Sequence, residues 1–269
     1  MVYMQNPPYY LSIGAILKNE SDSILEWLEH YIIRAVDHFY LIDDESTDNS
    51  VELLKPYIES GKVTLFRPKW GKHIGRQMSM YNEYILPRLH ESKWLMIVDL
   101  DEYVWSPRNI DLKIVLHECE HLGQIQIRHT IYGSNGHIKQ PSSIVSGFTR
   151  RSSQHPTENP GNYKYIVNTA FEFTSLNIHH ATFLHKHNEI NDFLCIESDY
   201  FTMNHYCCQS KEFWMNVKCT RGDCDEYRDR TEKDFSEVDL NDVEDLGLVN
   251  QSRGNPRFPL KPLPALRDV

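Results

Sequence analysis

Short apolar runs separated by amphipathic segments fill the first hundred residues of the chain. Four runs have the length and composition of buried strands: residues 10–17, 38–42, 63–66 and 94–98. Between them, apolar residues recur at helical spacing and predict three helices: from Ser23, from about 49 to 58, and from about 76 to 89. Strands that alternate with helices favour an α/β fold, in which crossover helices flank a mostly parallel sheet.

Polar residues mark the predicted helix starts. The segment Ser23-Ile-Leu-Glu26 has the spacing of a capping box, in which serine and acid each accept the other's backbone N–H. The polar turn from Asp43 to Asp48 precedes the second helix, and we expect it to cap that helix.

The pattern loosens after about residue 120. Three stretches still read as strands and one as a helix: residues 123–128, 163–167 and 179–184, and residues 210–218. Residues 133–136 predict a turn, and the polar, proline-containing segment 152–162 predicts an exposed loop. No linker divides the chain, so we predict a single domain over residues 1–250. It would have two halves, about 10–120 and 121–250, followed by an irregular tail, 251–269.

Polar clusters follow three of the predicted strands. They are Lys18-Asn19-Glu20 after the first, Asp43-Asp44 after the second, and Asp99 to Glu102 after the fourth. In a parallel sheet the ligand lies beyond the carboxyl ends of the strands. Because three strand ends bring polar side chains to one edge, the sequence predicts a binding site there.

The segment Asp99-Leu100-Asp101 places two carboxylates directly after an apolar strand. Close carboxylates repel each other unless a cation lies between them. Hard oxygen ligands suit Mg²⁺ or Mn²⁺, which also bind phosphate oxygens. A solvated acidic loop is the alternative reading. About a hundred residues later, His205 in the segment Asn-His-Tyr can complete a metal site. The alternative is an ordinary core or surface histidine, since the chain has 14 histidines.

Several cationic positions can meet an anionic ligand. Lys211 and Lys218 are seven residues apart and share one face of the predicted helix, and Arg221 follows just past its end. Arg76 and Gln77 stand at a predicted helix start, where anions are favoured. A solvated helix face explains the two lysines equally well.

The overall charge limits the possible partners. The formal net charge is −10, which argues against non-specific binding to nucleic acid or an anionic membrane. The N-terminus lacks the pattern of a signal peptide, and no apolar run approaches the roughly 20 residues that span a bilayer. We therefore expect a cytoplasmic protein without a membrane span.

Cysteines and histidines suggest further metal sites only weakly. There are six cysteines and no Cys-x-x-Cys pair, so reduced thiols are expected. A zinc site from Cys219, Cys224 and one of Cys207, Cys208 or His205 is an alternative. A histidine-rich middle shows no pair at a familiar ligand spacing: His129, His137, His179, His180, His185 and His187.

These motifs, taken in order, resemble those of glycosyltransferase family 92 and of its family 2-like relatives with the GT-A fold. The resemblance covers roughly residues 10 to 250. Its most specific parts are the acidic motif Asp99-Leu-Asp-Glu-Tyr103 and the closing motif that begins at Asn204-His-Tyr206. Other matching segments are residues 16–20, 26–30, 36–40, 44–48, 77–82, 132–137, 164–167, 178–179, 210–213 and 218–222. Tyr103 stands where the family usually has Phe.

The resemblance implies a GT-A fold, a nucleotide-sugar donor, most simply a UDP-sugar, and Mn²⁺ or Mg²⁺. Asp99 would meet the metal or the donor ribose, Asp101 would bind the metal, and His205 would be its third ligand. The strand-end residues Lys18, Asn19, Glu20, Asp43 and Asp44, with Arg76 and Gln77, would bind the nucleotide. Residues 10–120 would then form the nucleotide-binding half, and residues 121–250 the half that binds a glycan or glycoconjugate acceptor.

Glycosyl transfer leaves negative charge on the departing diphosphate, and the metal with Lys211, Lys218 or Arg221 would stabilise it. An inverting reaction also needs a base at the acceptor hydroxyl. Glu102 and His137 are the first candidates for this base, and Glu172 and His180 the others. Two further functions use the same residues: a metal-dependent nucleotide-sugar hydrolase or nucleotidyltransferase, and a binding protein without catalysis. The missing anchor, which eukaryotic relatives carry, suggests a bacterial or viral source.

Overall fold

A computed structural model describes residues 6–69, 74–153, 163–185, 192–195, 199–221 and 229–253. The strands are β1 Tyr9–Leu17, β2 His38–Asp43, β3 Val63–Phe66, β4 Ser92–Ile97, β5 Glu102–Trp105, β6 Gln124–Ile131, β7 Arg150–Arg151, β8 Tyr163–Asn168, β9 Phe173–Leu176, β10 Ala181–Phe183, β11 Asp192–Cys195, β12 Thr202–His205 and β13 Val243–Glu244. The α-helices are α1 Ile24–Ile32, α2 Ser50–Glu59, α3 Arg76–Met80, α4 Leu112–Glu118, α5 Ile144–Gly147, α6 Lys211–Phe213, α7 Cys219–Arg221, α8 Glu232–Val238 and α9 Gly247–Arg253. Two π-helical segments, η1 Tyr81–Ile85 and η5 Trp214–Lys218, and a 3₁₀ segment, η2 Leu86–Glu91, complete the elements.

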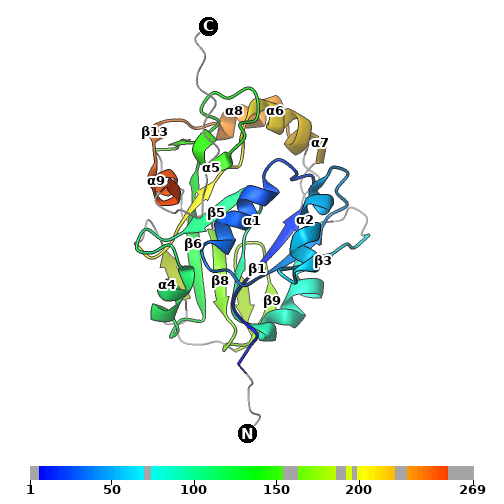
Figure 1. The fold of residues 1–269 in the computed structure, drawn as a ribbon, viewed down its shortest axis with the longest axis vertical. Coiled ribbons are helices and arrows are strands. Elements are labelled where there is room, and N and C mark those ends of the chain that lie inside the picture. Colours follow the sequence, from blue (N-terminus) through cyan, green and yellow to red (C-terminus); the bar gives the residue numbers. More distant parts are fainter. Residues whose placement is uncertain are drawn as a thin grey trace.

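A nine-stranded sheet runs through the middle of the molecule (Figure 1). Eight strands lie in the order β3-β2-β1-β4-β8-β6-β12-β5, and β11 pairs with β6. The pairs β3–β2, β2–β1, β1–β4, β6–β12 and β6–β11 are parallel. The pairs β4–β8, β8–β6 and β12–β5 are antiparallel. The predicted α/β fold with a mostly parallel sheet flanked by helices is confirmed.

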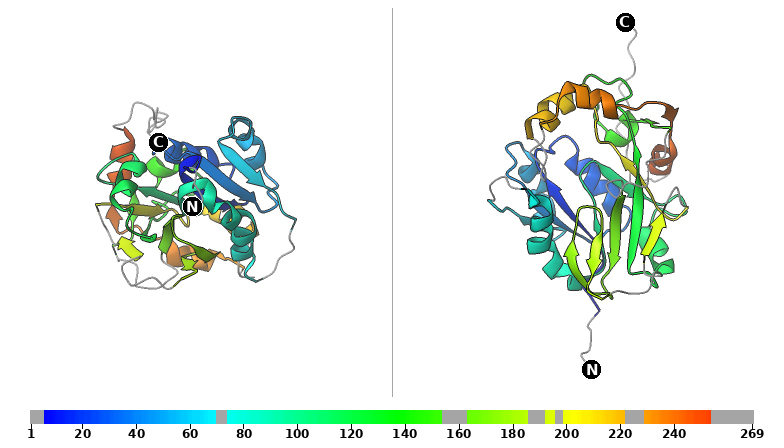
Figure 2. Two further views of the ribbon diagram at one scale, coloured as in Figure 1. Left: turned by 90° about the horizontal axis from the view of Figure 1, so that it is seen from below. Right: turned by 180° about the vertical axis from the view of Figure 1, so that it is seen from behind.

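Both faces of the sheet are covered, which explains the continuous apolar runs of its strands. On β2 and β4, alternate side chains enter two different cores. Phe39 and Met96 join α1 in one core, whereas Tyr40 and Ile97 join η1 in the other. Figure 1 shows α1 in front of the sheet, and Figure 2 shows from behind the two-stranded sheet of β9 and β10 on the opposite side.

Gly14 allows η1 to lie close against β1. A Cβ atom at this position would stand 2.7 Å from Ile85 Cδ1 and 2.8 Å from Ile97 Cδ1, closer than side chains can approach. The absence of a side chain on β1 therefore sets how near this helix packs to the sheet. Because η1 follows α3 directly along the chain, this packing also positions α3, which carries Arg76 and Gln77.

The predicted strands of the first hundred residues are confirmed to within two residues, but the capping box at Ser23 is wrong. The Ser23 side chain makes no cap hydrogen bond to α1; its hydroxyl instead donates to Glu20 Oε2 at 2.8 Å. Glu26 accepts hydrogen bonds from Ser143 Oγ and from the backbone N–H groups of Ile144 and Val145. It thus caps α5, more than a hundred residues away, rather than its own helix.

Other predictions differ in detail. The helix expected over residues 76–89 is divided into α3, η1 and η2. The helix expected over 210–218 comprises α6 and η5 and continues into α7. Residues 251–253 of the predicted tail belong to α9, and most of the predicted loop, 154–162, lies outside the described residues. Within the described part of the chain, no helix is long and apolar enough to cross a bilayer.

Candidate active site

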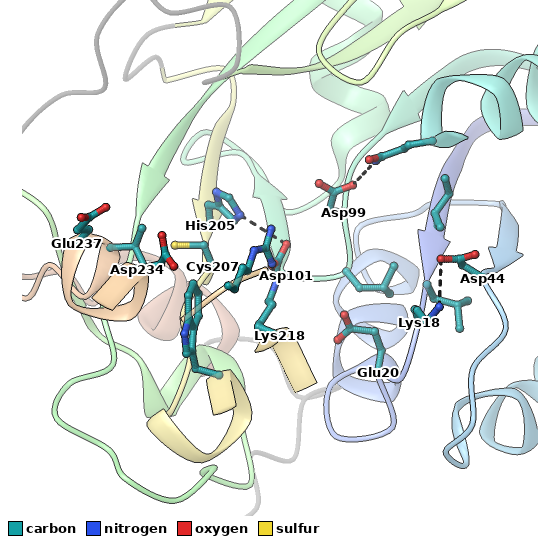
Figure 3. Close-up of a pocket in the computed structure, with 17 residues that line it drawn as sticks. Lys18, Glu20, Asp44, Asp99, Asp101, His205, Cys207, Lys218, Asp234 and Glu237 are labelled. Atoms are coloured by element: carbon teal, nitrogen blue, oxygen red, sulfur yellow. Dashed lines mark hydrogen bonds and ion pairs between the residues drawn. The ribbon is translucent and has the colours of Figure 1, made fainter. Parts of the chain in front are cut away.

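A pocket of about 420 Å³ opens at the carboxyl ends of β1, β2 and β4 (Figure 3). Its walls combine strand ends from the first half of the chain with β12, η5 and α8 from the second half. The lining comprises Ile16, Leu17, Lys18, Glu20, Asp44, Gln77, Asp99, Leu100, Asp101, His205, Cys207, Trp214, Lys218, Arg230, Asp234, Glu237 and Val238. The site that the strand ends predict is therefore a cavity shared by both halves.

The Asp-x-Asp segment forms a short turn between β4 and β5. The backbone N–H of Asp99 donates to Glu102 Oε2 at 2.7 Å, and the Trp27 indole donates to the Asp99 carbonyl at 3.0 Å. Behind the turn, the backbone N–H of Tyr206 donates to the Asp101 carbonyl at 2.8 Å. These bonds hold the turn rigidly and direct both aspartates into the pocket.

Asp101 is buried between two cationic partners. Lys218 Nζ lies 2.5 Å from Asp101 Oδ2, and His205 Nε2 lies 3.5 Å from Asp101 Oδ1. Burial raises the pKa of Asp101, but the charges of Lys218 and His205 outweigh this and hold it well below its usual range. Burial lowers the pKa of His205, whereas the Asp101 carboxylate raises it more, to about 9. The structure thus keeps Asp101 ionised at neutral pH.

Asp99 and Glu102 share a fully buried lysine. Lys164 Nζ, from β8, lies 2.8 Å from Asp99 Oδ2 and 3.9 Å from Glu102 Oε2. Gln77 Nε2 donates to Asp99 Oδ1 at 3.4 Å. Burial raises the pKa of Glu102, yet Lys164 and His129 lower it to about 2. Burial lowers the pKa of His129, and Glu102 opposes this. The ammonium group of Lys164 is the largest favourable influence on the Glu102 carboxylate.

The ends of β1 and β2 contribute a second charged group. Arg76 Nη2 lies 2.5 Å from Asp44 Oδ2, and Lys18 Nζ lies 3.6 Å from the same oxygen. Arg76 and Asp44 are both buried. Burial raises the pKa of Asp44, and the charges of Lys18 and Arg76 oppose this. The start of α3 is therefore tied to the end of β2.

Two other predicted residues support these strand ends from outside the pocket lining. Asn19, which has a left-handed backbone with φ 55°, accepts the backbone N–H of Thr47 at 2.8 Å. Asp43 pairs with Arg67 at 3.0 Å and accepts the Ser46 N–H at 2.9 Å. These contacts join the loops that follow β1 and β2.

Trp214, Arg230, Asp234 and Glu237 line the pocket on the side opposite Lys18 and Asp44; Figure 3 shows Asp234 and Glu237 on α8 across from those residues. Trp214 is buried, and its indole donates to the Thr231 carbonyl at 2.8 Å. Thr231 and Asp234 form a capping box at the start of α8. None of these four residues was predicted, although Thr231-Glu-Lys-Asp234 has capping-box spacing.

The structure brings eight predicted site residues to the pocket lining: Lys18, Glu20, Asp44, Gln77, Asp99, Asp101, His205 and Lys218. Besides Asn19, Asp43 and Arg76, described above, three others lie away from the lining: Glu102, His137 and Lys211. Glu102 is buried behind the pocket, and His137 Nε2 lies 3.0 Å from the Gly147 carbonyl. Lys211 pairs with Glu232 at the surface. The side chain of Arg221 lies outside the described residues.

Of the other candidates, Cys207 lines the pocket, whereas Glu172 and His180 do not. Glu172 is exposed and lies 3.4 Å from His185, and His180 is exposed. Cys224 and His187 fall outside the described residues, so the zinc alternative that includes Cys224 stays a prediction. Lys164, which holds Asp99, appeared in the sequence only as part of a family-like segment. Its role depends on the pairing of β8 with β4, which no local pattern reveals.

The model of glycosyltransferase family 92 matches residues 10–245, nearly the whole chain. The chain belongs to glycosyltransferase family 92. This match contains all of the pocket lining described above. The family resemblance expected from the sequence is thereby confirmed.

Curated relatives of this family 92 chain are distant in sequence. A glycosyltransferase family 92 protein of Oryza sativa subsp. japonica is 22% identical over 211 residues, which are 77% of this chain and 34% of that protein. The galactan beta-1,4-galactosyltransferase GALS2 of Arabidopsis thaliana is 26% identical over 127 residues, 44% of this chain and 24% of that protein. The chain thus matches about a third or less of the length of these relatives.

Among solved structures, the family 92 chain is similar to S. aureus TarS. A crystal structure of TarS 1-349 in complex with UDP has a TM-score of 0.44 and 15% identity, covering 72% of this chain and 60% of that one. The complex with UDP-GlcNAc has a TM-score of 0.42 and 14% identity, covering 85% and 64%.

Proposed function

We propose that this chain is a glycosyltransferase that moves a sugar from a nucleotide-sugar donor, first of all a UDP-sugar, to a hydroxyl group of a glycan or glycoconjugate. One observation carries the proposal. In a chain of family 92, Asp99, Asp101 and His205 meet in one pocket with the polar ends of β1 and β2. The nucleotide would lie along Lys18, Asp44 and Gln77, where the parallel strands end.

The donor set suits a divalent cation. Asp101 Oδ1 and His205 Nε2 lie 3.5 Å apart, near the roughly 3 Å that separates neighbouring ligands of an ion with metal–ligand distances of about 2.1 Å. A carboxylate and an imidazole together are typical ligands of Mn²⁺ as well as of softer metals. We therefore propose Asp101 and His205, with Asp99 beside them, as ligands of Mn²⁺ or Mg²⁺. When bound, such an ion supplies Lewis-acid stabilisation of the diphosphate leaving group.

The protein's own cations would do related work. Lys18, Lys218 and Arg230 line the pocket and can stabilise the negative charge that develops on the leaving group. Lys218 lies against Asp101, so it is already at the place where a metal-bound diphosphate would be held. Its buried position keeps it ordered before the donor arrives.

The strand-end side of the pocket, with Lys18, Asp44, Gln77 and Asp99, is called the nucleotide edge below. For an inverting reaction, we look for the base on the opposite side of the pocket. Glu102 is fully buried, and His137 contacts Gly147, so both lie outside the lining. Among the described lining residues on that side, Asp234 and Glu237 carry carboxylates (Figure 3). We propose that one of them accepts the proton of the acceptor hydroxyl.

The test is a thermal-shift panel of UDP, GDP, CMP and dTDP, each measured with Mn²⁺ and with EDTA. A ligand that binds only the folded state raises the melting temperature, by about 2.7 kcal/mol of stabilisation at a concentration of 100 Kd. We expect UDP to give a Mn²⁺-dependent rise that Asp101→Asn abolishes. Asp111→Asn, which keeps a capping residue at the start of α4 far from the pocket, is the matched control and should keep the rise.

The same protein is then incubated with UDP-sugars and a panel of glycan acceptors, and UDP release is measured. Acceptor-dependent release supports transfer. Release at the same rate without acceptor would instead indicate a nucleotide-sugar hydrolase. If no nucleotide raises the melting temperature, the pocket is not a donor site and the proposal fails.

A further inference from the structure

Behind the pocket, three adjacent strands bring one carboxylate and two imidazole rings together. In the register of β5 and β12, Glu102 lies opposite His205. In the register of β12 and β6, His205 lies opposite Ile131, two residues beyond His129. Residues two apart on a strand project from the same face. His129 and His205 accordingly lie side by side, with ring centroids 4.5 Å apart.

The potential ligand atoms of this cluster lie close together. One atom from each of Glu102, His129 and His205 lies within 4.8 Å of the others. Glu102 Oε1 and His129 Nε2 are 2.9 Å apart, yet both are buried without a hydrogen-bond partner. His205 Nδ1 is also buried and has no hydrogen-bond partner. Buried polar atoms without partners are rare in native structures, so three in one place point to a missing common partner.

The chemistry of these atoms indicates a cation as the common partner, because a carboxylate oxygen and two imidazole nitrogens are ligands of divalent ions. Asp99, Asp101 and Glu102 carry three negative charges in neighbouring positions, and Lys164, Lys218 and His205 balance them in the absence of a metal. A bound ion would displace the proton of His205, since ligating imidazoles are neutral. Neighbouring ligands of an ion about 2.1 Å away lie roughly 3 to 3.5 Å apart. Glu102 and His129 already have this spacing, at 2.9 Å, and the His205 ring would move slightly inward when the ion binds.

We propose that Glu102, His129 and His205 bind a divalent transition-metal ion of the zinc type behind the Asp-x-Asp turn. Two imidazole nitrogens and one carboxylate oxygen are a common set of protein ligands for Zn²⁺. Glu102 and His129 do not line the pocket, so this site lies behind the donor metal site proposed above and shares only His205 with it. His205 presents Nε2 to Asp101 in the pocket and has the buried Nδ1 left for this ion. The ion would thereby orient the imidazole ring that faces the donor.

Cobalt titration of the full chain tests the site. The protein is stripped with EDTA, dialysed and titrated with Co²⁺, whose visible absorption reports the ligands, and Zn²⁺ is then added as competitor. We expect the cobalt absorption to include one equivalent that depends on His129 and that Zn²⁺ displaces. In His129→Gln, the affinity of this site for Co²⁺ should be at least 100-fold weaker. Asp101→Asn keeps Glu102, His129 and Nδ1 of His205, so it should keep the His129-dependent signal while it abolishes the nucleotide shift. Failure of this proposal and of the proposed function can therefore be distinguished.

His30→Gln is the matched control. His30 is another fully buried histidine with an unpaired Nδ1, but it is not part of this cluster. Its replacement should leave cobalt binding unchanged. If His129→Gln fails to fold, as judged by circular dichroism, Glu102→Gln provides the same test. Two results would show that the cluster is only a buried acid–imidazole pair. The first is that the wild-type protein binds no Co²⁺ at this stoichiometry. The second is that folded His129→Gln or Glu102→Gln binds Co²⁺ as well as the wild type.

Discussion

The two ends of the pocket are built differently. At the nucleotide edge, each charged side chain is held by partners from other parts of the sheet: Asp44 by Arg76 and Lys18, and Asp99 by Lys164. On the α8 side, Trp214 and Lys211 contact the start of the helix, but the two lining carboxylates have partners on α8 itself. Asp234 caps its own helix, and Glu237 lies 4.0 Å from Lys233, one turn away.

This difference predicts that substitutions at the two ends of the pocket affect different properties of the protein. Long-range buried pairs form only when the sheet is assembled, so the nucleotide edge is coupled to the folding of the whole domain. Local pairs on a short helix depend little on the rest of the chain. We therefore expect changes at the nucleotide edge to reduce both stability and nucleotide binding, and changes on the α8 side to leave nucleotide binding intact.

The largest effect is expected from Lys164→Met. This change leaves Asp99 and the fully buried Glu102 without their cation, and breaking a buried pair costs about 3–5 kcal/mol. Urea unfolding measures the loss. The control is Lys93→Met, which removes the half-exposed pair with Glu120 and should cost less than about 1 kcal/mol. Equal losses in both variants would contradict the comparison.

A smaller loss is expected from Asp44→Asn. The amide still accepts a hydrogen bond from Arg76, so the free energy of unfolding should fall by about 1–3 kcal/mol rather than more. The rise in melting temperature with UDP and Mn²⁺ should also shrink. Asp43→Asn is the neighbouring control, since Asp43 lies outside the pocket lining and pairs with the exposed Arg67. A full nucleotide shift in Asp44→Asn would remove Asp44 from the donor site.

Thr231→Ala tests the α8 side. The variant loses the capping box with Asp234, and loss of an N-cap costs about 1 kcal/mol. The nucleotide-induced rise in melting temperature should not change, whereas acceptor-dependent turnover should fall. Thr220→Ala, at another helical threonine whose hydroxyl donates to Asn216, serves as the control. A reduced nucleotide shift in Thr231→Ala alone would show that α8 is coupled to the nucleotide edge.

The smallest effect is expected from Lys211→Ala. Lys211 pairs with Glu232 at the surface, where ion pairs contribute little. The urea midpoint and the nucleotide-induced shift should stay within error of the wild type, as in Lys55→Ala, which removes a similar exposed pair. A smaller nucleotide shift in Lys211→Ala would support the role that the sequence predicts for Lys211 at the diphosphate.

The sequence predicts the nucleotide edge better than the rest of the molecule, for a physical reason. β1 to β4 are apolar runs followed by polar strand ends, so both the strands and their functional residues can be recognised locally. β5 begins directly at Glu102 and is buried along its whole length. It shows no alternation, and the turn that separates it from β4 is the acidic motif itself, so the sequence predicts that motif but no strand after it.

The positions of Glu26 and His129 could not be predicted, because their partners are set by distant contacts. Glu26 has capping-box spacing to Ser23 but caps α5. His129 appeared as one of several scattered histidines, and its proximity to His205 and Glu102 follows only from the register of β6, β12 and β5. Spacing along the chain carries no information on such register.

The charge of the pocket lining has a consequence for the order in which ligands arrive. The described lining carries six carboxylates, Glu20, Asp44, Asp99, Asp101, Asp234 and Glu237. Against them stand four basic side chains: Lys18, Lys218, Arg230 and His205, whose pKa is raised to about 9. An excess of negative charge attracts cations and repels a free diphosphate. Nucleotide should therefore enter together with its metal ion, and raising the ionic strength should speed the association of metal-free nucleotide, because salt screens repulsion as it screens attraction.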